Sequence, residues 1–388
     1  MQIAVPKETD PVETRVAMTP DVATKLVKAG LELRCESGLG AAIGFPDEAY
    51  VEAGAEIIDD RDELLGNADL VLRVRAPEPD AIGPIKEGAL HVSYLDVFNR
   101  RDVVEAMAAA KLTCGSMEMI PRSTRAQKMD ALSSQHSLAG YYMVLLAAER
   151  LGKALPMMMT PAGTIQPARV FVIGAGVAGL QAIATAKRLG ARVEAFDTRP
   201  DTAEQVRSLG AKFVEVDLGE TGQTDQGYAK ELTDEQKAKQ REGMAAACAI
   251  ADIVITTAQL FGRPAPVVVH QEMLAAMKPG SVVIDYAVES GGNVAGSKPG
   301  EEVTIDGVRV IGLRNYPGQV AKDAARMYAA NLGNFVLEFW DAEAKELKLS
   351  EGDEIVDGLI ITRAGEIVHP TVRKHYELPE LPQHGGES

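Results

Sequence analysis

Three glycines, Gly174, Gly176 and Gly179, have the G-x-G-x-x-G spacing that binds the pyrophosphate of a dinucleotide. Each position meets a separate physical requirement. The first glycine allows a sharp turn, the second removes a Cβ so that the backbone can approach a phosphate, and the third lets a helix pack closely against its strand. Because the helix that follows has its amino end at this turn, its N–H groups face the phosphates. The spacing therefore predicts a phosphate-binding turn.

An acidic residue supports this interpretation. Asp197 follows the last glycine by 197 − 179 = 18 positions, where a carboxylate that binds both hydroxyls of an adenosine ribose is expected. Because this carboxylate would repel a 2′-phosphate, the sequence favours NAD over NADP. Arg199 is close enough to hold such a phosphate, so NADP stays open as an alternative. A purely structural role for the glycines is a second alternative, although strand, turn, helix, strand and acid occur in the expected order.

The elements that must position these residues are visible in the same region. Val170 to Ile173 is a β-branched and aromatic run that predicts a strand before the turn, and 180–188 predicts the helix after it. Arg192 to Phe196 predicts the next strand. Thr233 and Gln236 have the spacing of a capping box and predict the start of another helix. Strands are also expected at 212–216, 252–257, 281–286 and 307–311, and helices at 202–209 and 273–277.

The first part of the chain alternates strand and helix signals from residue 1 to about residue 133. This alternation indicates a parallel sheet covered by helices, here without a glycine fingerprint. Thr19 precedes a proline and an acid and is expected to cap a helix. Long helices are expected at 136–151 and 321–340. The predicted fold is α/β, with two doubly wound Rossmann-like domains joined by long helices and a nucleotide site in the cleft between them. The predicted domains are 1–134 plus 320–388, and 135–319.

Three segments lie outside this pattern. The stretch 217–232 is polar, rich in glycine and without periodicity, and a connection of this length is usually either functional or disordered. The consecutive methionines Met157 to Met159 are expected to fill gaps in the core rather than to bind a ligand. The tail from residue 341 onward is expected to contain short strands and turns.

The composition argues against several classes of function. The chain has 388 residues and a formal net charge of −16, which disfavours nucleic-acid binding and docking on anionic lipid through a basic surface. Its three cysteines, Cys35, Cys114 and Cys248, have neither disulfide nor zinc spacing, so no metal site is expected and a reducing cytoplasm fits best. No stretch approaches the length of a membrane span, so a partner would have to hold the chain at a membrane.

One known family is similar to this chain over nearly its whole length. The resemblance rests on the glycine turn, on Glu8, and on the segments Arg15 to Pro20 and Asp285 to Gly292. The family unites alanine dehydrogenases with the NAD(H)-binding domain of proton-translocating nicotinamide nucleotide transhydrogenase. The transhydrogenase branch implies an NAD(H)-binding subunit that exchanges hydride with NADP(H) on a separate polypeptide. It also implies a homodimer, an NADP(H)-binding partner domain, and a membrane-spanning subunit that places the cytoplasmic chain at the inner membrane.

The resemblance implies catalytic residues as well. The stretch from Arg122 to Ser133 looks like the Arg-Gln-Asp loop of the transhydrogenase branch, although a polar run is otherwise usually a solvated surface. Arg122 would carry a positive charge toward the pyrophosphate or the nicotinamide ribose. Gln127, Asp130 and Ser133 would hold ribose hydroxyls and the carboxamide. Tyr228 lies in a segment that looks like this branch's mobile loop and would close over the nucleotide. The other expected cofactor-binding residues are Gly174, Gly176, Val177, Gly179, Asp197, Thr198, Arg199, Thr257, Ala258 and Glu289.

Alanine dehydrogenases surround their substrate with an arginine, a lysine, a histidine and an aspartate. Arg15 matches the arginine, whereas Arg75, Asp96 and Glu289 stand where the other three would be. Oxidation of an amino acid requires a base of near-neutral pKa, a role suited to histidine and not to an aspartate with an ordinary pKa of about 4. Hydride transfer between two nicotinamides requires only that the rings be held in contact. In that reaction Glu289 either orders a turn near the nicotinamide or simply terminates a strand.

The residue pattern therefore favours the transhydrogenase reaction, and two alternatives stay open. One is an alanine-dehydrogenase-like, NAD-dependent oxidoreductase with an altered substrate. The other is a non-catalytic NAD(H) sensor, whose affinity for a partner would change when the segment around Tyr228 closes.

Overall fold

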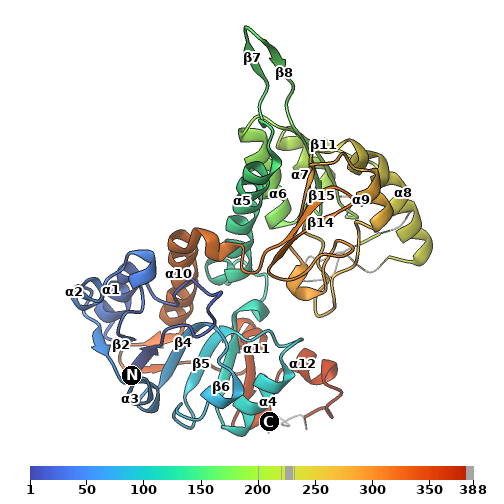
Figure 1. The fold of residues 1–388 in the computed structure, drawn as a ribbon. Coiled ribbons are helices and arrows are strands. Elements are labelled where there is room, and N and C mark those ends of the chain that lie inside the picture. Colours follow the sequence, from blue (N-terminus) through green and yellow to red (C-terminus); the bar gives the residue numbers. More distant parts are fainter. Residues whose placement is uncertain (200, 220, 223–229, 231, 382–388) are drawn as a thin grey trace. The chain divides into compact units, whose positions relative to one another are not determined.

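The computed structural model describes residues 1–199, 201–219, 221–222, 230 and 232–381 (Figure 1). The chain divides into two compact units, Met1–Gln135 with Ala321–Ser388, and His136–Val320. Each unit contains a mainly parallel sheet with helices on it. The predicted α/β class with two Rossmann-like sheets is therefore confirmed.

The sheet of the first unit has eight strands in the order β19-β18-β6-β5-β4-β1-β2-β3. The six strands from β6 to β3 are parallel, and their order is that of the Rossmann fold, with the reversal of winding between β1 and β4. The central strand β4 is buried on both faces, as a parallel sheet requires. The strands are β1 (Gln2–Val5), β2 (Glu32–Glu36), β3 (Glu56–Ile58), β4 (Leu70–Arg75), β5 (Leu90–Tyr94), β6 (Thr113–Ser116), β18 (Ile360–Arg363) and β19 (Glu366–Ile367).

Helix α1 of the first unit begins as predicted, but its cap differs. Thr19 occupies the N-cap position without accepting a hydrogen bond from the helix. Its Oγ1 instead donates to the carboxylate of Asp21 at 2.7 Å. A hydroxyl bonded to a charged acceptor forms a stronger bond than one bonded to an amide, so the nearby acid captures the threonine. The helices are α1 (Pro20–Lys28), α2 (Asp47–Glu52), α3 (Arg61–Gly66), α4 (Arg101–Ala109), α10 (Ala321–Phe339), α11 (Glu354–Leu359) and α12 (Pro370–His375).

The carboxyl-terminal segment completes this unit. Helix α10 buries Tyr328, Leu332, Phe335 and Val336 on one face, the spacing of an amphipathic helix against a core. The prediction of only short strands and turns after residue 341 is wrong, because α11 and α12 lie there. Strand β18 pairs antiparallel with β6 and extends the first sheet. Short helices of six residues carry too little periodicity to be distinguished from turns in the sequence.

The sheet of the second unit has seven strands in the order β11-β10-β9-β12-β13-β15-β14. Strands β11 to β15 repeat the Rossmann order, and β14 is an antiparallel edge that the sequence did not predict. The first two residues of β14, Glu301 and Glu302, are exposed, so it lacks an apolar alternation. The strands are β9 (Arg169–Ile173), β10 (Arg192–Phe196), β11 (Lys212–Phe213), β12 (Ile253–Thr256), β13 (Val282–Asp285), β14 (Glu301–Ile305) and β15 (Val308–Gly312).

Helix α8 confirms the predicted capping box. Thr233 Oγ1 accepts from the N–H of Gln236, and the Gln236 side chain accepts from the N–H of Thr233. Helix α5 begins at Ala131, five residues before the predicted start, and crosses the boundary between the two units. The helices are α5 (Ala131–Leu151), α6 (Val177–Arg188), α7 (Thr202–Ser208), α8 (Asp234–Ile250) and α9 (Gln271–Ala276).

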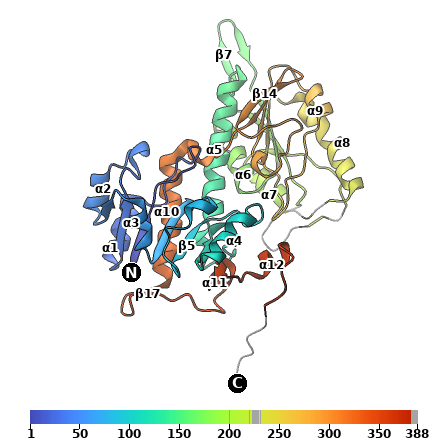
Figure 2. The same ribbon diagram turned by 60° about the horizontal axis from the view of Figure 1, so that its bottom comes forward.

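The methionine run does not fill a core. Met158–Thr160 forms β7, which pairs antiparallel with β8 (Gly163–Ile165), and this hairpin extends beyond the helices of its own unit in both views (Figures 1 and 2). Met159 is 82 % exposed, and Met157, Met158 and Ile165 are also exposed. The prediction of buried methionines is wrong because a short apolar run shows hydrophobicity but not which surface covers it.

Candidate nucleotide site

The glycine turn of the second unit has the geometry that its spacing predicts. Gly174 has φ +98°, and a Cβ there would lie 2.6 Å from Thr257 Oγ1. A Cβ on Gly179 would lie 1.8 Å from the carbonyl oxygen of Gly174, so the third glycine is required for helix α6 to approach the strand. At Gly176 the nearest heavy atom would be 3.8 Å away, on Arg199. The second position therefore faces open space, and Gly176 is also the N-cap of α6, where an anion is favoured.

Asp197 lies at the end of β10 and is almost fully used by the protein itself. Its Oδ1 accepts from the backbone N–H and Nε of Arg199, at 2.8 and 2.9 Å. Its Oδ2 accepts from the N–H of Ala175 and from Nη2 of Arg199, both at 2.7 Å. A carboxylate has about four acceptor positions, and all are occupied here. Ribose hydroxyls can therefore bind Asp197 only when the Arg199 side chain withdraws.

The carboxyl ends of β12 and β13 carry a buried network that the sequence analysis missed. Asn293 is completely buried, and its side chain accepts from the N–H of Ala258 at 3.0 Å and donates to the carbonyl of the same residue at 2.8 Å. The carboxylate of Asp285 accepts from the N–H groups of Asn293 and Val294. Burial raises the pKa of Asp285, although these N–H groups oppose the effect. Thr257 Oγ1 donates to the carbonyl of Gly174 at 3.0 Å, which links this network to the glycine turn. A buried asparagine after two glycines was the available signal.

Glu289 orders a turn. It lies in a short 3-10 helix, four residues after the end of β13, so it does not terminate that strand. Its carboxylate accepts from Nε of Arg314 at 3.3 Å and from the N–H of Asn315 at 3.2 Å. Asn315 has φ +53°, and this hydrogen bond helps to hold its left-handed backbone conformation.

Tyr228 lies outside the described residues, as does much of the segment 217–232. The described residues of this segment are attached to their surroundings. Thr221 Oγ1 donates to the carbonyl of Thr198 at 2.6 Å, and Gln236 donates to the carbonyl of Leu218 at 2.9 Å. The predicted closure of Tyr228 over the nucleotide stays a prediction.

The predicted catalytic loop lies in the first unit, where its neighbours anchor it. Arg125 donates to Glu338 at 2.8 Å and to Asp353 at 2.7 Å, and Lys128 donates to the other oxygen of Glu338 at 2.6 Å. Ala126 and Met129 are completely buried, whereas Arg122 and Gln127 are exposed. The anchored residues therefore alternate with Arg122 and Gln127, whose side chains reach solvent.

Asp130 and Ser133 have a structural partnership of their own. Asp130 immediately precedes α5, and its carboxylate accepts from the N–H of Ser133 at 2.8 Å and from the Ser133 hydroxyl. This is N-terminal capping of a helix, which explains why α5 starts earlier than predicted. The sequence pattern did not reveal the cap because the apolar periodicity becomes clear only later in the helix.

Two family models match consecutive parts of the chain. The alanine dehydrogenase/PNT N-terminal domain matches residues 4–139, and the alanine dehydrogenase/PNT C-terminal domain matches residues 143–370. The chain belongs to the alanine dehydrogenase/PNT family. The resemblance that the glycine turn and the segment after Arg15 indicated is thus confirmed.

Relatives within the alanine dehydrogenase/PNT family match the chain over nearly its full length. The first section of the split NAD(P) transhydrogenase subunit alpha of Rhodospirillum rubrum is 48 % identical over 379 residues, which cover 96 % of this chain and 99 % of the relative. A crystal structure of transhydrogenase from Sinorhizobium meliloti is 42 % identical, with a TM-score of 0.83 and coverage of 96 % and 100 %. An L-alanine dehydrogenase structure is 26 % identical, with a TM-score of 0.81 and coverage of 97 % and 99 %.

The positions that the alanine dehydrogenase branch of the family uses for substrate form an ion-pair cluster in the first unit. Arg15 is 5 % exposed and donates Nε and Nη2 to Glu13, each at 2.7 Å, and Nη1 to Gln135 at 2.9 Å. Arg75 Nε also donates to Glu13, at 2.9 Å. Burial alone would raise the pKa of Glu13, but the charges and hydrogen bonds of Arg15, with Arg75, lower it to about 2. Asp96, at the histidine position, is exposed and accepts from the Asn99 side chain.

Metal and membrane features give further limits. No group of three His, Cys, Asp or Glu side chains within the described ranges is arranged to hold a metal ion. All three cysteines are buried and free. In the part of the chain that the structure describes, no helix combines the length and hydropathy needed to span a membrane.

Proposed function

We propose that this chain is the NAD(H)-binding subunit of a proton-translocating transhydrogenase, and that it exchanges hydride with NADP(H) on a partner subunit. The glycine turn carries the proposal, because a dinucleotide pyrophosphate fits the open space at Gly176 beside the amino end of α6. Relatives that match the whole chain are named as the first section of an NAD(P) transhydrogenase subunit alpha. The exposed Asp96 in place of a histidine agrees with a reaction that removes no proton from an amino group.

In this proposal the chain contributes position rather than acid–base chemistry. Gly174, Gly176, Val177 and Gly179 hold the pyrophosphate through backbone groups, and Asp197, with Thr198 and Arg199 beside it, binds the adenosine ribose. Thr257, Ala258 and Glu289 complete the cofactor site, and the nicotinamide supplies the hydride when it is bound. Arg122, Gln127, Asp130 and Ser133 orient the ribose and the carboxamide. Correct orientation of two reacting rings is enough to accelerate such a transfer greatly.

The partners follow from the same proposal. A membrane-spanning subunit and an NADP(H)-binding domain would hold the chain at the cytoplasmic face of the membrane. The homodimer would use the exposed β7-β8 hairpin, whose four apolar side chains are Met157, Met158, Met159 and Ile165. A two-stranded hairpin is marginally stable by itself, so an apolar surface on it indicates a covering partner.

Hydride transfer in one cuvette tests the function. The assay combines this chain, a purified NADP(H)-binding transhydrogenase domain, NADPH, and an oxidised NAD analogue with a shifted absorbance. Rapid reduction of the analogue that requires both proteins is the expected result. Oxidation of NADH by the chain alone with pyruvate and ammonium would instead establish a small-acid oxidoreductase. NADH binding without transfer in either assay would establish a sensor.

A further inference from the structure

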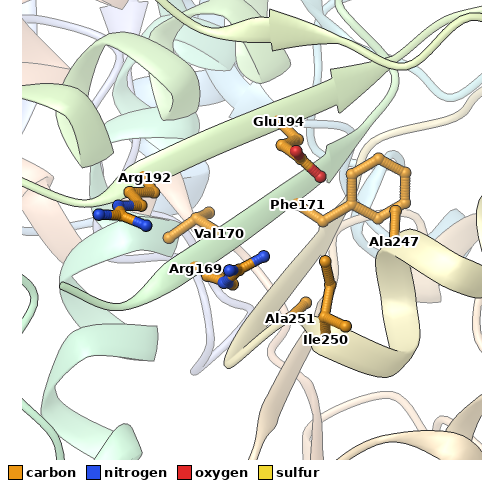
Figure 3. Close-up of a pocket in the computed structure, with 8 residues that line it drawn as sticks. All are labelled: Arg169, Val170, Phe171, Arg192, Glu194, Ala247, Ile250 and Ala251. Atoms are coloured by element: carbon orange, nitrogen blue, oxygen red, sulfur yellow. The ribbon is translucent and has the colours of Figure 1, made fainter. Parts of the chain in front are cut away.

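The amino ends of β9 and β10 border a pocket at the edge of the second sheet opposite the glycine turn (Figure 3). The pocket has a volume of about 160 Å³. Figure 3 shows Arg169 and Arg192 on the strands, with Phe171 and Ile250 beside them. The lining residues are Arg169, Val170, Phe171, Arg192, Glu194, Ala247, Ile250 and Ala251.

Strand register brings the two arginines together. Arg192 pairs with Arg169 across the parallel strands, and Glu194 pairs with Phe171 two residues further along. Because strand side chains alternate between faces, all four belong to the same face of the sheet. The last turn of α8, with Ile250, packs beside that face and closes the pocket. The pocket therefore combines two guanidinium groups with an apolar wall.

The two guanidinium groups have no counterion among the described residues. Both arginines are exposed, and neither side chain makes a hydrogen bond or ion pair within the described part of the chain. The acid on the same face, Glu194, is 3.2 Å from Lys212. Like charges directly opposite each other on neighbouring strands are destabilising. Placement of these two arginines in register, in a chain with net charge −16, is therefore a local cost without a structural return.

Nearby charges increase the positive potential. Asp252 follows the pocket residue Ala251, and its carboxylate is 2.8 Å from Lys153 and 3.4 Å from Lys278. Together with the pocket residues and Lys212, this edge has five cationic and two acidic side chains, 5 − 2 = 3 positive charges. An anion is attracted to such an edge, and guanidinium groups bind phosphate and carboxylate with two parallel hydrogen bonds.

We propose that this pocket binds a small organic anion, with its phosphate or carboxylate group on Arg169 and Arg192 and its apolar part against Phe171 and Ile250. The site is separate from the proposed nucleotide site. Arg169 begins β9 and Gly174 follows its end, so five strand residues, about 16 Å, separate them. The proposal does not depend on NAD(H) binding.

Calorimetric titration with phenyl phosphate and inorganic phosphate tests the site, using full-length protein saturated with NADH. One phenyl phosphate per chain should bind, and Arg169→Gln and Arg192→Gln should each weaken it about tenfold or more, with NADH affinity unchanged. Ile250→Ser should weaken phenyl phosphate and not inorganic phosphate. Arg207→Gln removes an exposed arginine that pairs with Glu215 outside the pocket, and it should change nothing.

Three results would overturn the proposal. Equal, weak binding by every variant would mean an adventitious ion only. Loss of the oligomer in Arg169→Gln or Arg192→Gln, seen by sedimentation velocity, would assign the arginines to a contact between copies. Absence of phenyl phosphate binding by wild-type protein would exclude the site. If NADH itself fails to bind, the titration is repeated with NADH-free protein, so failure of the proposed function is distinguished from failure of this site.

Discussion

Asp197 and Arg199 show how one carboxylate can have two competing partners. The arginine is two residues away and occupies the acceptor positions that a ribose would need. Its Nη2 is also the atom nearest to the open position at Gly176. Arg199 therefore acts as an internal substitute for the nucleotide, and binding of NAD(H) must break a bidentate ion pair before it can use Asp197.

Substitution of this pair should separate the two roles. Asp197→Ala should weaken NADH binding about tenfold or more, since both ribose hydroxyls lose their charged acceptor. Arg199→Met should tighten NADH binding a few-fold, because no ion pair then has to break, while Asp197 still rejects NADPH. Both are measured by fluorescence titration. Unchanged affinity in Asp197→Ala would sink the ribose assignment, and weaker binding in Arg199→Met would show that the arginine contacts the nucleotide.

Gln127 is exposed beside two anchored residues, so its side chain can be changed without disturbing the loop. Gln127→Asn shortens the side chain by one methylene and should slow hydride transfer far more than it weakens NADH binding, because misorientation raises the barrier at unchanged contact. The measurements are the two-protein transfer rate and an NADH titration of the same sample. Equal losses in both would mean that the loop only anchors the cofactor.

Glu13 makes part of the stability of the first unit dependent on pH. Its pKa is about 2 in the folded chain and starts from 4.5, so its contribution is complete above 4.5 and is lost as pH falls toward 2. Glu13→Gln leaves Arg15 and Arg75 buried without their acid and should cost about 3 kcal/mol at neutral pH. Urea unfolding at several pH values should show this difference shrinking below pH 4.5. A difference that stays constant down to pH 3 would contradict the assignment.

The β7-β8 hairpin shows what an element can do when its own unit does not cover it. Its exposed methionines are flexible and polarisable, which suits an adaptable contact surface. Strand pairing supplies its only regular hydrogen bonds among the described residues, and three residues in each strand make it a short one. The hairpin is therefore the element on which we expect assembly to depend.

A charged residue at the tip of this surface should weaken the homodimer. Met159→Lys places an ammonium group in the proposed contact, and sedimentation velocity should show a dissociation constant raised about tenfold or more. Met327→Lys is the matched control, because Met327 is 47 % exposed on α10, outside the hairpin. If both variants sediment as the wild-type protein does, the hairpin is not the dimer contact.

At the scale of the whole molecule, the same strand order serves two purposes. The second unit has glycines after its first Rossmann strand, and the turn leaves space at Gly176. In the first unit Glu8 follows β1 instead, with a carboxylate 3.6 Å from Arg73 and an N–H donor from Val74 at 2.7 Å. Burial raises the pKa of Glu8, and Arg73 opposes this. Protein charges therefore fill the reversal point of the first sheet, and the second sheet alone presents a phosphate turn there.

The local sequence determined much of the fold and of the nucleotide turn. Strand periodicity, glycine spacing and the Thr233 capping box depend on residues within a few positions of one another, so each was predictable. The family motifs added the catalytic loop, whose role is a prediction still. Short or polar elements such as β14 and α12 were missed because they carry little periodic signal.

Only the tertiary structure decided which partners these residues have. The occupation of Asp197 by Arg199 depends on a rotamer, the burial of Asn293 on the meeting of two strand ends, and the exposure of Met159 on the lack of a covering surface. Strand register likewise placed Arg169 opposite Arg192, which are 23 positions apart (192 − 169 = 23). Sequence spacing sets what a residue can do locally, but long-range pairing and burial depend on which surfaces meet when the chain folds.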